Sequence, residues 1–239
     1  LYSVLNKLNS PDVKIITVED PIEYQLPGVM QTQIDVEHGY TFEAAIRSLL
    51  RQNPNIMMIG EIRDEETAKI AIEASLTGHL VLSTIHANSA AGAVTRFVGL
   101  GIDRQMLASS VECTIGQRLV RRVCDSCREE LIPDPPLVEQ AQKILSQINN
   151  PLVSVPANLK FYHGRGCEKC KGLGYKGRIG LYEVVEMDPE MQKLIQSQGV
   201  TDFDIEQLAI KHGTVTMAQD GVLKALAGET TLDEIFRVV

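Results

Sequence analysis

The sequence has no tryptophan, few aromatic residues (5%) and no stretch approaching the ~18–20 uninterrupted apolar residues that a membrane-spanning helix needs. Its start lacks a basic segment followed by an apolar one, so we expect no secretory leader within these 239 residues. Hydrophobic residues at 44% and charged residues at 23% are close to globular averages, which excludes a disordered or collagen-like chain. We therefore expect a soluble protein with one large domain or two modest ones.

The chain also lacks the positive charge of a nonspecific nucleic-acid binder. Its formal net charge is −8 and its pI is about 5.2, whereas such binding depends on cations that neutralise phosphates. Basic and aromatic residues are not interleaved as they are in grooves for single-stranded nucleic acid. We therefore expect no nucleic-acid partner and disfavour translocation along nucleic acid.

None of the 18 glycines is followed by lysine. The phosphate-binding loop GxxxxGK[ST] requires that step, because its backbone amides and its lysine together hold the phosphates of a nucleotide. The sequence therefore contains no phosphate cradle of this type.

Four of the five cysteines form two CxxC pairs, Cys124–Cys127 and Cys167–Cys170. Each pair offers two sulfur ligands from one tight turn, and two such turns supply the tetrahedron that zinc prefers. The spacer 128–166 is longer than that of common zinc ribbons, so we expect a folded insertion there. The alternatives are redox dithiols or ordinary buried thiols. The remaining cysteine, Cys113, is expected to be a small core residue.

Glycines cluster at the second cysteine pair, between Gly164 and Gly180. Positive φ angles favour glycine, so glycine is common in tight metal-binding turns.

Residues 119–180 also hold ten Lys and Arg against six Asp and Glu, so the segment is basic within an acidic chain. These cations either solvate the surface and offset the charge of the thiolates, or they form a docking face for an acidic partner.

Short apolar runs alternate with amphipathic patterns through the first half of the chain. Short β-branched or apolar runs indicate buried strands, and apolar residues at helical spacing indicate helices. Strands and helices in alternation favour a parallel α/β sheet. The expected strands are 13–18, 29–34 (at an edge), 56–59 and 79–86, and the expected helices are 1–9, 41–50, 65–76 and 90–100.

The pattern changes after Gln117. The cysteine-containing segment includes a predicted helix over 137–148, and the chain is helical from Asp188 onward. The spacing Thr231–Glu234 predicts a capping box that opens the last helix, after another predicted helix over Met217–Leu226. We expect three parts: 1–119 (α/β core), 120–180 (zinc-binding segment) and 181–239 (helical subdomain).

Polar residues follow each of three predicted strands. In open α/β sheets, ligands bind beyond the carboxyl ends of the strands. A solvated loop could supply one polar cluster by chance, but three clusters at the ends of successive strands are harder to explain in this way. The clusters are Glu19, Asp20 and Glu23 after the first strand, Glu61 and Asp64 after the second, and His86 and Asn88 after the third.

The apolar run that leads to Gly60-Glu61 resembles a Walker B strand, whose carboxylate binds Mg²⁺ through water or orients an attacking water. Phosphoryl transfer needs mainly such positioning and counter-charge. For Arg63 and Asp64 the structural alternative is an ion pair or a helix cap. For His79 and His86 it is a hydrogen bond within the sheet.

Several long motifs resemble those of secretion traffic ATPases, over the whole chain. Relatives of the type II secretion and type IV pilus assembly branch carry the zinc-binding cysteines, which pilus retraction ATPases generally lack. The matching stretches are 16–24 (Asp box), 59–64 (Walker B), 77–88 (His box), 117–127 with 166–170 (zinc insertion), and 217–221.

The resemblance implies a RecA-like α/β fold, here without its P-loop, with a tetracysteine zinc insertion and a C-terminal helical subdomain. It implies a homo-hexamer at the cytoplasmic face of the inner membrane that uses ATP, Mg²⁺ and Zn²⁺. Its partners would be a membrane platform protein and a cytoplasmic recruitment protein. Whether the cargo is a pilus or a type II secretion pseudopilus stays open.

The resemblance also implies roles for individual residues. Glu61 would be the Walker B carboxylate, and either Glu19 or Glu23 would activate the attacking water. His86, with His79 as a second candidate, would contact the γ-phosphate region. Further residues near phosphate or Mg²⁺ would be Asp20, Arg47, Arg51 and Arg63, and the zinc ligands would be Cys124, Cys127, Cys167 and Cys170.

In this family the P-loop directly precedes a helix much like the one that begins at Leu1. We therefore expect the chain to be the C-terminal portion of a longer ATPase, and to be inactive by itself because the P-loop supplies much of the nucleotide affinity. The competing hypothesis is a non-catalytic, zinc-stabilised module that docks to the membrane platform protein.

Overall fold

The computed structural model describes residues 1–239 and contains two compact units. We describe each unit by itself. The first unit comprises Leu1–Asn88, Gly92–Glu112 and Met187–Val200, and the second comprises Ser89–Ala91, Cys113–Glu186 and Thr201–Val239. The three-part division expected from the sequence stays a prediction; its borders at 119/120 and 180/181 fall within strands.

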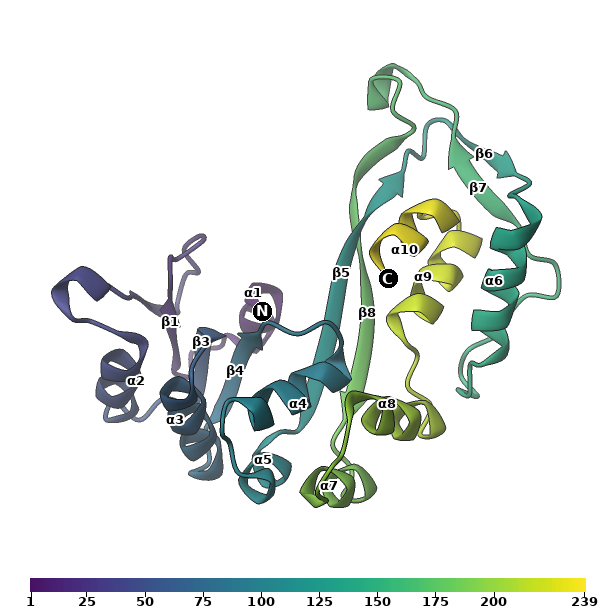
Figure 1. Ribbon diagram of the computed structural model, residues 1–239. Helices are drawn as coiled ribbons and strands as arrows, with labels where there is room; N and C mark the ends of the chain where they lie inside the picture. Colours follow the sequence, from purple (N-terminus) through teal and green to yellow (C-terminus); the bar gives the residue numbers. More distant parts are fainter. The chain divides into compact units, whose positions relative to one another are not determined.

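The first unit is built on a parallel sheet of four strands in the order β2-β1-β3-β4 (Figure 1). All five residues of β1 are buried, because this strand lies between two others and consists of apolar and β-branched residues up to its last position. The three predicted strands and the predicted edge strand are confirmed. The strands are β1 (Ile15–Glu19), β2 (Met30–Gln33), β3 (Ile56–Ile62) and β4 (Leu80–Ile85).

Helices accompany this sheet, and their starts follow from capping residues. Thr41 accepts a hydrogen bond from the Ala44 amide, and Asp64 accepts one from the Thr67 amide. The four predicted helices are confirmed, whereas α5 was not foreseen. The helices are α1 (Tyr2–Leu8), α2 (Phe42–Leu50), α3 (Glu65–Leu76), α4 (Ala90–Gly99), α5 (Arg104–Ser110) and α7 (Pro189–Gln196).

The second unit contains a long antiparallel pair of strands, β5 (Cys113–Val123) and β8 (Tyr175–Glu186). Neither strand was predicted from the sequence. Figure 1 shows α9 (Met217–Leu226) and α10 (Leu232–Val238) beside this pair, and they contact β8 and β5 respectively. The other elements are β6 (Arg128–Leu131), α6 (Pro135–Ser146), β7 (Phe161–Gly164), a 3-10 turn (Glu168–Cys170) and α8 (Asp202–Lys211).

The expectation of a helix inside the spacer between the cysteine pairs is confirmed by α6, which packs on α9. β6 and β7 pair antiparallel on either side of that helix in the sequence. A buried apolar cluster joins these elements to the last two helices. It contains Ala141, Leu145, Phe161, Val222, Ala225, Leu232 and Ile235.

Two local expectations for the second unit need correction. The capping box at the last helix is only half formed: the Thr231 hydroxyl accepts from the Glu234 amide, but the Glu234 carboxylate binds Arg121 and Arg237 instead. Cys113, expected in the core, is exposed at the start of β5. Sequence spacing did not reveal either outcome, because both depend on strand β5. None of the helices combines the length and hydrophobicity needed to cross a membrane.

Candidate functional site

The parallel sheet of the first unit brings the predicted polar residues to one edge. Val18 pairs with Ile59, and Ile62 pairs with Ile85, so the carboxyl ends of β1, β3 and β4 lie together. The residues at or just beyond these ends are Glu19, Asp20, Glu23, Glu61, Arg63, Asp64, His86 and Asn88.

Glu61 is the centre of this group. Its side chain is 15% exposed and lies 2.5 Å from the Arg63 guanidinium and 3.3 Å from Nε2 of His86. The hydrogen bond from Arg63 lowers the pKa of Glu61, in spite of partial burial, and the same pair raises the pKa of Arg63. The carboxylate is therefore kept ionised between two cationic or proton-donating groups. Such an arrangement can bind a metal through water or orient a water molecule.

Glu19 is buried and fully engaged by neighbouring side chains. The Thr17 hydroxyl donates to one carboxylate oxygen at 2.5 Å, and the Gln31 amide donates to the same oxygen at 3.1 Å. The Tyr2 hydroxyl donates to the other oxygen. A buried carboxylate that accepts hydrogen bonds from three donors is held in a fixed position.

Glu23 lies in an exposed loop, four residues after Glu19. Its backbone amide donates to the Tyr2 hydroxyl at 3.2 Å, while its side chain has no partner. The Tyr2 ring lies 4.4 Å from the ring of Tyr24, and burial together with the bond to Glu19 raises the pKa of Tyr2. One hydroxyl therefore connects the positions of both candidate acids.

Asp20 is exposed, and its charge contributes to the raised pKa of Arg63. Asp64 caps α3, which is the structural alternative considered for it.

His79 precedes β4 and therefore lies at the opposite end of that strand from His86. Its Nδ1 lies 2.9 Å from the Ala74 carbonyl, so the structure does not bring His79 to the group around Glu61.

Arg47 and Arg51 lie on or just after α2, both exposed. Arg47 pairs with Glu43 at 3.0 Å, one turn earlier on the same helix. Since α2 ends shortly before β3 begins, both arginines lie toward the amino end of the strands. The structure therefore does not bring Arg47 and Arg51 to the group around Glu61.

Sequence reasoning missed Tyr2, Thr17 and Gln31, which hold Glu19. No motif or spacing distinguishes these residues, because they come from a helix and two strands that meet only in the folded sheet. A polar residue in a buried strand, as Thr17 is, was the only signal available.

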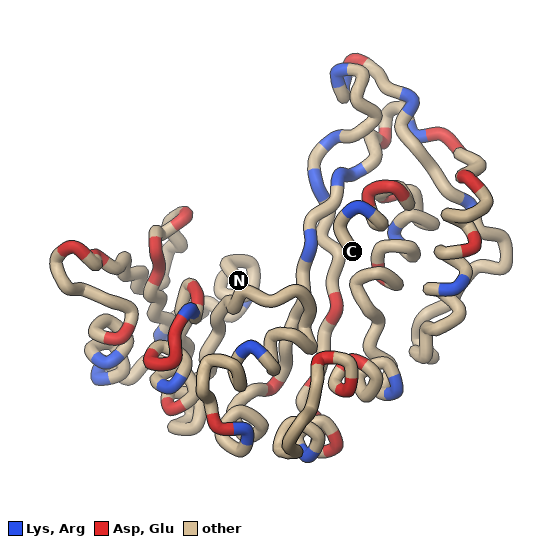
Figure 2. The backbone as a smooth tube through the Cα atoms, viewed as in Figure 1, with Lys and Arg blue, Asp and Glu red and all other residues tan.

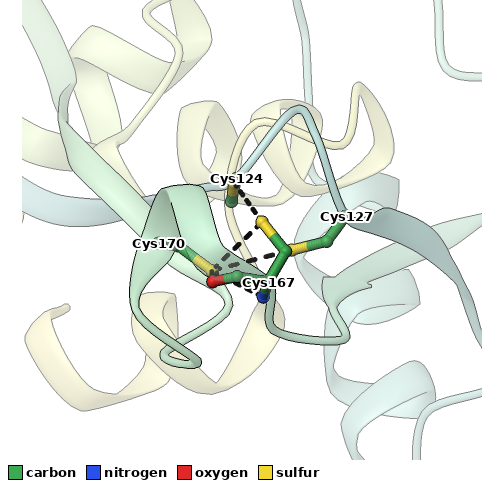
Figure 3. A group of neighbouring side chains, drawn as sticks. All are labelled: Cys124, Cys127, Cys167 and Cys170. Carbon is green, nitrogen blue, oxygen red and sulfur yellow. Dashed lines mark hydrogen bonds between the residues drawn. The ribbon is translucent and has the colours of Figure 1, made fainter.

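The four cysteines of the two CxxC pairs converge in the second unit (Figure 3). Their sulfur atoms all lie within 4.8 Å of one another, and three of the four residues are buried. Neighbouring sulfurs are 3.7, 3.8 and 3.9 Å apart. Four sulfurs bound to zinc at about 2.3 Å in a tetrahedron would lie about 3.8 Å apart. The cluster is therefore compatible with a zinc site.

The surroundings of the cluster also fit a cation. Burial raises the pKa of Cys127 to about 12, and burial acts in the same direction on Cys170. Against burial, the backbone amides of Cys167 and Gly174, at 3.1 and 3.3 Å from the Cys170 sulfur, act together with the Cys167 and Cys127 thiols and lower the pKa of Cys170 to about 6. Four neighbouring thiols cannot all ionise without a cation among them, and a divalent metal ion supplies that charge.

Glycine permits the backbone turns at this cluster. Gly174 has φ 76°, and a Cβ at Gly164 would lie 2.0 Å from the Gly174 carbonyl oxygen. Any side chain at Gly164 would therefore separate two segments that must touch. This close approach explains part of the glycine clustering noted in the sequence.

Comparisons with known proteins agree with the motifs. The sequence matches the family described as "Type II/IV secretion system protein" over residues 1–237. The type IV pilus assembly ATPase PilB of Thermus thermophilus is 42% identical over 234 residues, which are 98% of this chain and 25% of the relative. Type II secretion system protein E of Dickeya dadantii is 43% identical over 238 residues, 100% of this chain and 45% of the relative. The chain thus spans between a quarter and a little under half of these relatives.

Solved structures share the fold. The ATPase DotB of Legionella pneumophila superposes with a TM-score of 0.67 at 20% identity, over 99% of this chain and 55% of that one. The pilus retraction motor PilT with bound ADP gives 0.66 at 23% identity, over 100% of this chain and 55% of that one. These likenesses confirm the RecA-like α/β fold. The match over residues 1–237 confirms the family resemblance drawn from the motifs: the chain belongs to the family described as type II/IV secretion system protein.

Proposed function

We propose that a protein containing these 239 residues is an ATP-hydrolysing motor, a homo-hexamer that powers assembly of a type IV pilus or a type II secretion pseudopilus. The observation that carries this proposal is the group formed by Glu61, Arg63 and His86 at the carboxyl ends of β3 and β4. The name of the Thermus thermophilus relative, a type IV pilus assembly ATPase, points to the same activity, and the name of the Dickeya dadantii relative points to type II secretion. We further propose that the motor works at the cytoplasmic face of the inner membrane, with a platform protein and a recruitment protein as partners.

Among the candidate acids, we assign water activation to Glu23. Glu19 is buried and already accepts three hydrogen bonds, whereas the Glu23 carboxylate is exposed and without a partner. A general base must be free to approach the proton that it takes. In this proposal Glu19 is a positioning residue that anchors the loop through Tyr2.

Glu61 would hold Mg²⁺ through water, and Arg63 and His86 would face the phosphates. When bound, Mg²⁺ neutralises charge on the β- and γ-phosphates. Arg47 and Arg51 are exposed and lie toward the other end of the strands, so we propose that they act across a subunit interface of the hexamer. We assign Zn²⁺, with a structural role, to the tetracysteine cluster.

Glu61→Gln and Glu23→Gln test the assignment in a longer chain that carries a phosphate-binding loop ahead of Leu1. We expect each variant to lower the rate of phosphate release about 100-fold, because a positioned carboxylate contributes on that scale. Glu23→Gln should change unfolding by urea little, since the Glu23 side chain is exposed.

Glu37→Gln, which changes an exposed carboxylate in the 3-10 helix Val36–His38 after β2, is the matched control and should retain the full rate. An unchanged rate in Glu61→Gln would remove Walker B chemistry from that residue. A full rate in Glu23→Gln with loss in Glu19→Gln would reverse the assignment of the two acids.

The 239-residue chain itself should bind Mg·ATP only weakly. No glycine is followed by lysine, so the amide nest and lysine of a phosphate loop are missing from these residues. Isothermal titration calorimetry should give no saturable heat at micromolar ATP. Micromolar affinity would contradict the expectation and reveal a phosphate site elsewhere in the chain.

The same missing Gly-Lys step supports one alternative, a zinc-stabilised interaction module without catalysis. The longer chain distinguishes the two, because the alternative expects no phosphate release with the loop restored. It also expects Glu61→Gln to have no effect on any activity of the protein.

A further inference from the structure

The zinc cluster is surrounded by positive charge in an otherwise acidic chain. Figure 2 shows Lys and Arg gathered around the turns that carry the cysteines and on the adjoining ends of β5 and β8. We call the exposed cations there the basic face. It consists of Arg122, Arg165, Lys169, Lys171, Lys176 and Arg178.

Five of these six cations have no acidic partner. Only Arg122 forms an ion pair, with Asp125 at 3.2 Å. Arg121, next to it in the sequence, is excluded from the basic face because Glu234 holds its guanidinium at 2.6 Å. Surface cations in a folded protein are commonly matched by nearby carboxylates, and here Asp125 and Glu168 are the only acids among them.

The positive charge exceeds what the thiolates require. A zinc ion with four thiolates carries two negative charges, and the two local carboxylates add two more. Six cations therefore leave an excess of about two positive charges, while the whole chain has a formal charge of −8. Charge compensation of the metal site accounts for only part of the basic face.

The basic face includes a concave region. A cleft of about 550 Å³ is lined by Arg122, Asp125, Lys169 and Lys176, together with Cys124. Arg122 already binds the Asp125 carboxylate, which shows that a carboxylate fits beside the cations that line the cleft. The side chain of Leu173, 70% exposed within the same turn, offers an apolar contact next to the cations.

We propose that the basic face and its cleft are the docking site for an acidic segment of a partner protein. Carboxylates spaced along an extended chain can enter the cleft and reach Lys169 and Lys176, whereas a flat bilayer cannot enter it. Elsewhere the net negative charge of the chain repels such a segment, so the encounter is directed to this face. The inference rests on the proposed docking to a partner protein but not on ATP hydrolysis, so the two can fail separately.

The test uses the zinc-loaded 239-residue chain and a fluorescein-labelled octaglutamate peptide, followed by fluorescence anisotropy at low salt. We expect saturable binding that weakens steeply between roughly 50 and 300 mM salt. Lys169→Glu/Lys176→Glu should weaken binding at least about tenfold, because two attractive contacts become repulsive. Lys7→Glu/Lys143→Glu changes the net charge equally at exposed sites outside the basic face and should bind as the wild type does.

Metal analysis keeps the comparison valid, because each variant must hold the same zinc per chain as the wild type. Equal weakening in both double variants would overturn the proposal, since it would show a general charge effect. Binding of phosphatidylglycerol vesicles without binding of the peptide would overturn it in favour of a membrane surface. Self-association abolished only by Lys169→Glu/Lys176→Glu would overturn it in favour of a second copy of this chain.

Discussion

Loss of one of the proposed zinc ligands, as in Cys127→Ser, should release the metal and locally unfold the two turns around residues 124–127 and 167–174. Structural zinc contributes roughly 10–16 kcal/mol of apparent binding free energy in small peptides, which matches or exceeds the stability of a typical domain. Without the ion, the closely spaced sulfurs have no common partner. The measurement is zinc content per chain together with hydrogen exchange of the backbone amides.

The expected result is about one zinc per chain in the wild type, and faster exchange confined to the turns of the cluster in Cys127→Ser. The apolar cluster around Phe161, Val222 and Ile235 does not include the cysteines, so α6, α9 and α10 should keep their protection. Cys113→Ser is the matched control, because Cys113 is exposed and lies outside the cluster. Freshly purified protein with well under one zinc per chain would contradict the assignment.

Glu234→Gln should destabilise the second unit by about 3 kcal/mol at neutral pH. Glu234 is 1% exposed and accepts hydrogen bonds from the Arg121 amide and from the guanidinium groups of Arg121 and Arg237. These bonds lower its pKa from 4.5 to about 2, in spite of burial. A difference of about 2.5 pKa units corresponds to about 3 kcal/mol. Urea unfolding of wild type and variant at pH 7 measures the difference.

The lowered pKa of Glu234 also predicts that the stability of the fold depends on pH. Because the folded-state pKa of Glu234 lies below its unfolded value, the carboxylate stabilises the fold above about pH 4.5. That contribution decreases as the pH falls from about 4.5 toward 2. The wild type should therefore lose stability steeply over this range, and Glu234→Gln should lose less.

Glu139→Gln, an exposed position on α6, is the control and should follow the wild type. The proposal would be contradicted if Glu234→Gln had the stability of the wild type at pH 7 and lost stability at low pH as the wild type does. The bonds to Arg121 would then make no net contribution to the free energy of unfolding. That outcome would also restore the capping role that the sequence spacing predicts for Glu234.

Much of the first unit could be predicted because its information is local. β1, β3 and β4 are short apolar runs followed by polar residues, and a parallel sheet places their carboxyl ends at one edge. The position of Glu61 followed from that rule. The donors around Glu19 could not be predicted, because Tyr2, Thr17 and Gln31 meet only after the sheet has formed.

The second unit was less predictable. β5 and β8 pair over residues about 60 positions apart, and one face of the pair is exposed although it carries Ile115, Leu119 and Val184. A clear alternation of apolar and polar residues, the usual signal of a half-buried strand, is therefore missing. The cysteine pairs predicted that the four thiols converge, because the spacing within each CxxC pair is itself a local signal.

The sequence by itself determined the elements and motifs that depend on neighbouring residues: the parallel strands, the helix caps and the two CxxC turns. Only the tertiary structure decided which residues of one local pattern are buried or paired and which are left exposed. It buried Glu19 and left Glu23 free, and it turned Glu234 from a helix cap into the partner of Arg121, 113 positions earlier. The physical reason is that burial and charge pairing depend on contacts between distant segments, which no periodicity or spacing records.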